Sequence, residues 1–222
     1  MNNIEFKNAR NLMVTNQLRP NKINDLLILD LFRKIKKEEF LDEKNKGIAY
    51  SDLDIGLINN RGYLKNLHLA QLIQNSQIKK EHKVLHIGGL TGYVSTIISS
   101  ICSKLIVLEN ETSLLEQLEK NIKYLKIENI KIYNQNLKNG FQDKSPYDII
   151  FIDNPIQKVS DSIKEQLNSD YGMLIMIKKI NENFSHAYKI IRNQNNYTEE
   201  YLFDIFTNFE LYKDKKDFIF ND

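Results

Sequence analysis

Residues 84–93, with the sequence VLHIGGLTGY, decide the fold of this 222-residue chain. A short apolar run leads into Gly88 and Gly89, reaches Gly92, and is followed by an apolar helical pattern. This order is typical of a buried parallel strand that turns through a glycine loop into a helix. A nucleotide-like cofactor can bind at such a turn.

An acidic residue follows the glycine loop at the spacing expected for a ribose-binding carboxylate. The apolar run 105–108 ends at Glu109, about twenty residues after the first loop glycine, where a carboxylate can accept hydrogen bonds from both ribose hydroxyls. The loop and the carboxylate together predict a Rossmann-like cofactor site.

Composition excludes several other classes of protein. The 31 basic and 29 acidic side chains give a formal net charge of +2, so no broad field favours nucleic acid or a membrane surface. Cys102 is the only cysteine, which excludes an internal disulfide and a cysteine metal cluster, and we interpret it as a core residue. The four histidines lack metal-ligand spacing, so no metal is predicted.

No apolar run approaches the ~20 residues of a membrane span, and residues 1–10 lack a secretory core, so we expect a cytoplasmic protein.

The chain divides into a helical extension, residues 1–80, and a Rossmann-like core, residues 81–222, which we expect to form one compact unit. In the extension, 24–32 is predicted to be a helix capped by Asn24, and 67–73 a helix that packs on the sheet. Residues 49–66 give a weak, turn-rich signal.

The core alternates strands with helices, which predicts a parallel sheet covered on both faces. Further strands are expected at 105–108, 130–133, 147–152 and 174–177. A hairpin is expected from 188–192 and 197–203, and a last strand at 217–220. The helix after Glu109 is predicted to start with a capping box of Ser113 and Glu116 and to bury one stripe, formed by Leu114, Leu118, Ile122 and Leu125.

Ligands of an open parallel sheet bind along the carboxyl edge of its strands. That edge is expected to collect the loop 88–92, Glu109, the segment 134–137 and the segment 153–155.

Four segments together resemble one known family. They are ARNLMVTNQLRP (9–20), VLHIGGLTGY (84–93), PYDIIFIDNP (146–155) and LFDIFTNFELYKDKKDFIF (202–220). They resemble bacterial protein-L-isoaspartate O-methyltransferases, in particular a divergent branch with an MVxxQLRP opening. The resemblance implies a Rossmann-like sheet, with an antiparallel final strand, that binds S-adenosylmethionine. It also implies methyl transfer to the free carboxylate of an abnormal aspartyl residue in a damaged protein or peptide, which starts repair through a succinimide.

The resemblance assigns cofactor roles residue by residue. Gly88, Gly89 and Gly92 match the loop beneath the methionine part, and Glu109 matches the ribose-binding acid. Asn136 stands near the position where the family places an Asp against the adenine amine. The other residues expected at the cofactor are His86, Tyr93, Asn110, Leu137 and Asp153.

The acceptor side is expected to involve Arg61, Leu64, Lys65 and Asn154. No catalytic residue is assigned, because a carboxylate is already ionised at neutral pH and its methylation needs no strong base. The expected binding partner is a damaged protein or peptide, with neither nucleic acid nor membrane, and the chain is expected to be a monomer.

Three positions depart from the family pattern. His86 replaces an acidic residue, Leu90 replaces the middle glycine of GxGTG, and Leu64 stands at a serine position. A leucine with positive φ costs on the order of 1 to 2 kcal/mol. The departures keep open a binding or regulatory protein that has the methyltransferase fold with weak or lost cofactor use.

A methyltransferase with a different acceptor is a further alternative. An enzyme for nucleic-acid amines would carry an Asn/Asp-Pro-Pro-aromatic tetrad after the fourth strand, and Asn154 and Pro155 begin that pattern. Ile156 and Gln157 do not continue it. A nicotinamide dehydrogenase fits less well, because Leu90 breaks GxGxxG.

Overall fold

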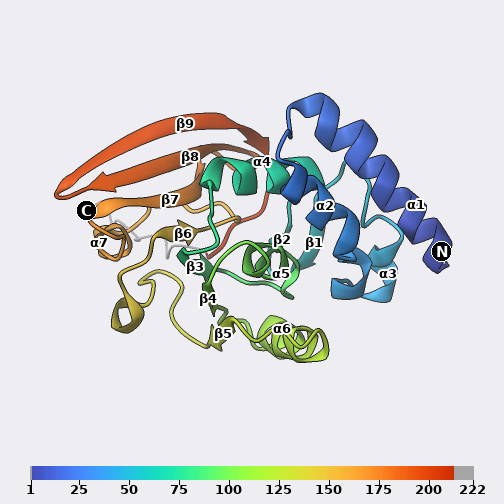
Figure 1. The fold of residues 1–222 in the computed structure, drawn as a ribbon, viewed down its shortest axis with the longest axis horizontal. Helices are drawn as coiled ribbons and strands as arrows, with labels where there is room; N and C mark the ends of the chain where they lie inside the picture. Colours follow the sequence, from blue (N-terminus) through green and yellow to red (C-terminus); the bar gives the residue numbers. More distant parts are fainter. Residues whose placement is uncertain (1, 213–222) are drawn as a thin grey trace, which may run out of the picture.

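A central seven-stranded sheet organises the computed structural model, which describes residues 2–212 (Figure 1). The strand order is β5-β4-β3-β6-β7-β8-β9. The first five of these strands in that order are parallel, β8 is antiparallel to β7, and β9 is antiparallel to β8. The strands are β3 (Lys83–Ile87), β4 (Lys104–Leu108), β5 (Ile130–Tyr133), β6 (Ile149–Phe151), β7 (Asp170–Lys179), β8 (Phe184–Asn193) and β9 (Asn196–Phe206). The predicted, mostly parallel Rossmann-like sheet is confirmed.

Apolar side chains alternate between the two faces of the sheet because successive strand residues point in opposite directions. Leu105 and Val107 of β4 belong to one buried cluster, whereas Ile106 and Leu108 belong to another. The first cluster also contains Phe6, Phe32 and other residues of the N-terminal extension, so the extension and the sheet share an apolar core.

Helices and short turns flank the sheet. The α-helices are α1 (Asn3–Met13), α2 (Leu26–Lys34), α3 (Glu43–Lys46), α4 (Asn66–Ser76), α5 (Tyr93–Ser99), α6 (Thr112–Tyr124) and α7 (Asp161–Glu165). Figure 1 shows α1, α2 and α3 together at one side of the molecule. A π-helix (Val14–Leu18) and 3-10 turns at Arg19–Asn21, Lys37–Phe40 and Gln142–Lys144 complete the set. Among residues 2–212, no helix is both long and apolar enough to cross a bilayer.

Local capping differs from the sequence prediction at two helices. Asp25, rather than Asn24, caps α2, and its Oδ1 accepts hydrogen bonds from the amides of Leu27 and Ile28. Helix α6 begins at Thr112 without a side-chain cap, so the predicted Ser113–Glu116 capping box is wrong. Leu114, Leu118 and Ile122 are buried as expected, but Leu125 is 37% exposed because it follows the end of the helix.

The segment with the weakest sequence signal forms a small hairpin. β1 (Ile55–Ile58) and β2 (Arg61–Tyr63) pair antiparallel and carry Arg61 toward the carboxyl edge of the main sheet. At the other end of the chain, the β8–β9 hairpin turns between Asn193 and Asn196 as predicted. The strand expected at 217–220 lies outside the described residues.

Candidate functional site

The glycine loop crosses directly over the end of β4. The amides of Gly88 and Gly89 both donate to Leu108 O, at 2.9 and 3.1 Å. A Cβ atom built on Gly89 would lie only 2.4 Å from Val107 Cγ1, so this crossing requires the absence of a side chain. Gly92, the N-cap of α5, has φ 101°, a conformation that favours glycine.

Leu90 occupies the left-handed region with φ 51°. Its side chain is 1% exposed and belongs to the larger apolar cluster. Its amide donates to Glu109 Oε2 at 2.9 Å. Burial of the side chain and this hydrogen bond therefore offset the backbone strain that the sequence predicts.

Glu109 is buried and surrounded by donors. Arg61 binds it through two hydrogen bonds, Nη1 to Oε1 at 2.6 Å and Nη2 to Oε2 at 2.8 Å. The amides of Leu90, Asn110 and Glu111 donate to the same carboxylate. The side chains of Arg61 and Glu109 are 6% and 0% exposed. The proposed ribose acid is therefore held inside the protein by a guanidinium.

The glycine loop is also covered at Gly88. A Cβ atom built on Gly88 would lie 2.4 Å from Leu211 Cδ1 and 3.2 Å from Arg61 Nη2. Leu211 is held in place by its amide, which donates to Pro155 O at 2.8 Å, and the side chain is 2% exposed. Arg61 and Leu211 thus both face the glycine loop.

His86 forms part of a buried polar chain beside the loop. Its Nδ1 lies 2.9 Å from Ser95 Oγ, and its Nε2 lies 3.2 Å from Asp153 Oδ1. Asp153 Oδ2 is buried and has no hydrogen-bond partner within the described part of the chain. An acidic group from the end of β6 therefore lies next to the position where the family pattern places one in β3.

Asn154, the next residue in the chain, binds the β1–β2 hairpin. Its side chain pairs with both backbone groups of Gly62, as acceptor at 3.4 Å and donor at 3.2 Å. The pairing fixes the β1–β2 hairpin, and with it Arg61, against the end of β6.

The remaining acceptor-side residues point in different directions. Leu64 is fully buried, and its carbonyl accepts a hydrogen bond from the buried Lys37 Nζ at 3.4 Å. Lys65 lies near the surface and pairs with Asp52 at 3.3 Å. The hairpin therefore brings Arg61, but neither Leu64 nor Lys65, to the glycine loop.

Three further residues were expected at the cofactor, and their own contacts are as follows. Tyr93 is buried among Phe32, Phe40 and Tyr63, and its amide donates to Tyr63 Oη at 3.1 Å. Asn136 is exposed and caps its own turn by accepting a hydrogen bond from the Lys138 amide. Leu137 is buried in the second apolar cluster.

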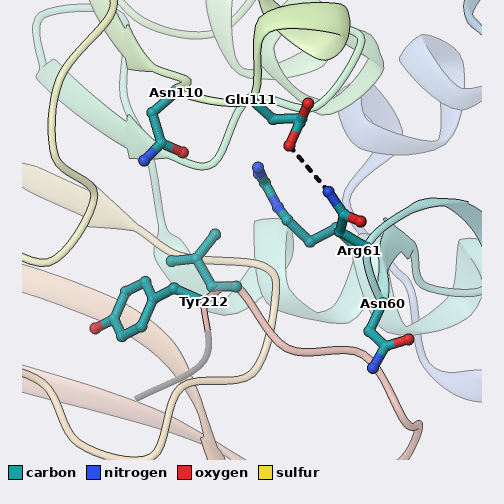
Figure 2. Close-up of a pocket in the computed structure, with 7 residues that line it drawn as sticks. Asn60, Arg61, Asn110, Glu111 and Tyr212 are labelled. Atoms are coloured by element: carbon teal, nitrogen blue, oxygen red, sulfur yellow. Dashed lines mark hydrogen bonds between the residues drawn. The ribbon is translucent and has the colours of Figure 1, made fainter. Parts of the chain in front are cut away.

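A pocket of about 500 Å³ opens beside Arg61 of the buried pair. Figure 2 shows the residues that line it. Asn110 and Glu111, which follow β4, form one wall, and Asn60 and Tyr212 are among the residues opposite (Figure 2). Asn59 Nδ2 donates to Glu111 Oε2 at 3.0 Å and links the hairpin to the start of α6. The full lining is Asn59, Asn60, Arg61, Asn110, Glu111, Leu211 and Tyr212.

Comparison with known proteins decides the family. The family described as protein-L-isoaspartate(D-aspartate) O-methyltransferase matches residues 8–204. The chain belongs to this family. It is 25% identical over 173 residues to protein-L-isoaspartate O-methyltransferase 1 of Syntrophobacter fumaroxidans, covering 78% of this chain and 80% of that protein. It is 26% identical over 172 residues to the Brucella anthropi enzyme, covering 78% and 79%. A solved protein-L-isoaspartate O-methyltransferase shares the fold, with a TM-score of 0.77 at 23% identity over 90% of this chain and 65% of that one.

Membership of the protein-L-isoaspartate O-methyltransferase family implies S-adenosylmethionine as the cofactor. The residues expected to hold it are those of the glycine loop and Glu109. In this conformation, however, the surrounding residues do not fit the group, because Arg61 fills the hydrogen-bonding face of Glu109 and Leu211 covers Gly88.

Sequence reasoning missed Leu211 and Ser95 at this site and did not pair Arg61 with Glu109. Ser95 lies nine residues after His86. The helical pattern around it does not distinguish it from other residues of the helix. The pairing of Arg61 with Glu109 joins residues 48 apart, through a hairpin whose strands have only four and three residues.

Proposed function

We propose that this chain methylates the free carboxylate of isoaspartyl residues in damaged proteins or peptides, with S-adenosylmethionine as methyl donor, and so acts in protein repair. Membership of the protein-L-isoaspartate O-methyltransferase family over residues 8–204 carries the proposal. The glycine loop over β4, with Glu109 at the end of the same strand, supports it from the fold.

The chemistry suits the side chains present. An acceptor carboxylate with a pKa near ~4 is ionised at neutral pH, so no protein group has to remove a proton. Holding reactants in line can lower a barrier by roughly 7 to 11 kcal/mol. Ser95, His86 and Asp153 form a hydrogen-bonded chain, but all three are buried, which argues against Ser95 as a nucleophile.

Recognition of the acceptor carboxylate by the β1–β2 hairpin and the neighbouring segment after β6 stays a proposal. Leu64 cannot donate a hydrogen bond to a carboxylate, and the cation of Lys65 is shared with Asp52. Arg61 is the basic group nearest to Gly88 among those expected at the acceptor. The cytoplasmic location and the monomeric state likewise stay predictions.

Product analysis tests this function. The purified chain is incubated with methyl-labelled S-adenosylmethionine and an isoaspartyl peptide, and base-labile methyl ester is counted. The matched control is the same peptide with a normal aspartyl residue. Ester on the isoaspartyl peptide alone is expected; equal labelling of both peptides would contradict the proposed specificity, and no ester on either would contradict the activity.

A further inference from the structure

Two protein elements occupy the face on which a cofactor would lie. The first is the Arg61 guanidinium, which uses Nη1 and Nη2 on Glu109, while its buried Nε has no hydrogen-bond partner among residues 2–212. A ribose that used Glu109 would have to share or replace these hydrogen bonds. Arg61 is therefore an internal competitor at the ribose position.

The second element is the segment 207–211, which follows β9 and crosses the carboxyl edge of the sheet. Three backbone hydrogen bonds attach it at separate points: Thr207 N to Asn183 O, Glu210 N to Asn60 O, and Leu211 N to Pro155 O, at 3.0, 2.9 and 2.8 Å. Lys179 Nζ pairs with Glu210 Oε2 at 2.9 Å. Leu211, at the end of this segment, projects onto Gly88.

We propose that Arg61 and the segment 207–211 form a closure over the cofactor pocket, and that binding of an adenosyl ligand displaces both. This inference rests on the cofactor of the proposed function. The observations that carry it are the contact of Leu211 with the glycine loop and the two hydrogen bonds from Arg61 to Glu109. In the closed arrangement Arg61 occupies both carboxylate oxygens of Glu109, and Leu211 covers Gly88.

The neighbouring pocket provides a place for Arg61 after release. It holds about 500 Å³ beside the guanidinium and is lined by the carboxylate of Glu111 and by the amides of Asn59 and Asn60 (Figure 2). A released guanidinium can therefore find acceptors within the pocket instead of being buried without a partner. The closure can open without leaving Arg61 as an uncompensated buried charge.

Only open molecules bind the ligand. The apparent affinity is therefore the intrinsic affinity multiplied by the fraction of molecules that are open. The Leu211→Ala variant shortens the side chain that covers Gly88 and leaves Glu109 and Arg61 intact. Leu167→Ala is the matched control, because Leu167 is a buried leucine of the same apolar cluster that does not approach Gly88. We expect Leu211→Ala to raise the affinity for S-adenosylhomocysteine by about tenfold or more, and Leu167→Ala to leave it within about twofold.

Hydrogen exchange on the unmodified chain gives a second readout that depends on no variant. The amides of Glu210 and Leu211 are bonded in the closed state, so S-adenosylhomocysteine should increase their exchange, whereas ligands ordinarily protect the amides they cover. Increased exchange at these amides, with tighter binding by Leu211→Ala, supports the closure.

The other outcomes overturn it in distinguishable ways. Binding that is equal in the unmodified chain and in Leu211→Ala, with unchanged or slower exchange at Glu210 and Leu211, would reject the closure and retain the cofactor. Absence of binding in both proteins would reject the closure together with the cofactor of the proposed function. Methyl ester formation is measured separately and reports on the acceptor.

Discussion

Arg61 and Glu109 form a two-point ion pair in the interior of the protein, with N–O distances of 2.6 and 2.8 Å. The pair joins the β1–β2 hairpin to the end of β4, and three backbone amides complete the shell around the carboxylate. It thereby fixes the hairpin at the edge where the glycine loop lies.

Removal of either partner should destabilise the fold strongly. A buried charge that loses its partner typically costs about 3 to 5 kcal/mol, so Arg61→Ala is expected to reduce the free energy of unfolding by about that amount. The exposed pair Lys34–Asp30 is the control, and Lys34→Ala should change stability by less than about 1 kcal/mol. Urea unfolding measures both variants; similar small effects for the two would contradict the assigned role of the Arg61–Glu109 pair.

Lys37 should make stability depend on pH. Burial lowers its pKa to about 7 from the ordinary 10.5, although Asp54 opposes the shift. Between about pH 7 and pH 10 the unfolded chain binds the proton that the folded chain has lost, so stability should rise with pH in this window. Each pKa unit corresponds to about 1.4 kcal/mol, and the gain is expected to be on the order of a few kcal/mol.

The variant Lys37→Met isolates this contribution. It removes the titrating amine and keeps most of the side-chain volume between the rings of Tyr63 and Tyr93. Denaturant titrations at pH 7 and pH 9 should show a stability difference in the unmodified chain that is much smaller in Lys37→Met. A difference of the same size in both proteins would assign the dependence to another group.

His68 should limit stability in acid. Burial lowers its pKa to about 4, Lys65 contributes in the same direction, and the ring packs beside Phe203 at 5.8 Å between centroids. The unfolded chain takes up a proton near pH 6.5, so stability should fall as pH decreases from about 6.5 to about 4. Thermal melts of His68→Phe across this range should show a weaker dependence than the unmodified chain; an unchanged slope would rule out His68 as the cause.

Gly92 and Gly47 offer a matched pair of glycine substitutions. Gly92 has φ 101°, and a Cβ atom there would lie 2.8 Å from Leu118 Cδ1, so Gly92→Ala should destabilise by at least about 1 to 2 kcal/mol. Gly47 has φ −61° and open space around its Cβ position, and Gly47→Ala should be neutral or slightly stabilising. Denaturation midpoints compare them directly, and equal midpoints would show that the loop tolerates a side chain at Gly92.

Local patterns predicted the parts of the fold that depend on neighbouring residues. The strand, glycine loop and helix around Gly88, the acidic end of β4 and the turn at 193–196 follow from short sequence signals and are present in the structure. The β1–β2 hairpin was not predicted, because its strands are short and their pairing depends on contacts such as Asn154 with Gly62.

The sequence does not predict that Leu211 covers Gly88, because this contact also depends on residues that are remote in the chain. Leu211 reaches Gly88 only because segment 207–211 is bonded to Asn60 and Pro155, residues that are remote in the chain. Four short segments of sequence indicate the family, whereas tertiary structure determines which side chains cover the glycine loop.

Equilibrium dialysis with labelled S-adenosylmethionine tests the central claim, that the pocket formed by the glycine loop and Glu109 binds an adenosyl cofactor. We predict binding of about one equivalent per chain, displaced by S-adenosylhomocysteine and unaffected by NAD. Retention of no label at millimolar cofactor, or displacement of the label by NAD at equal concentration, would contradict the account.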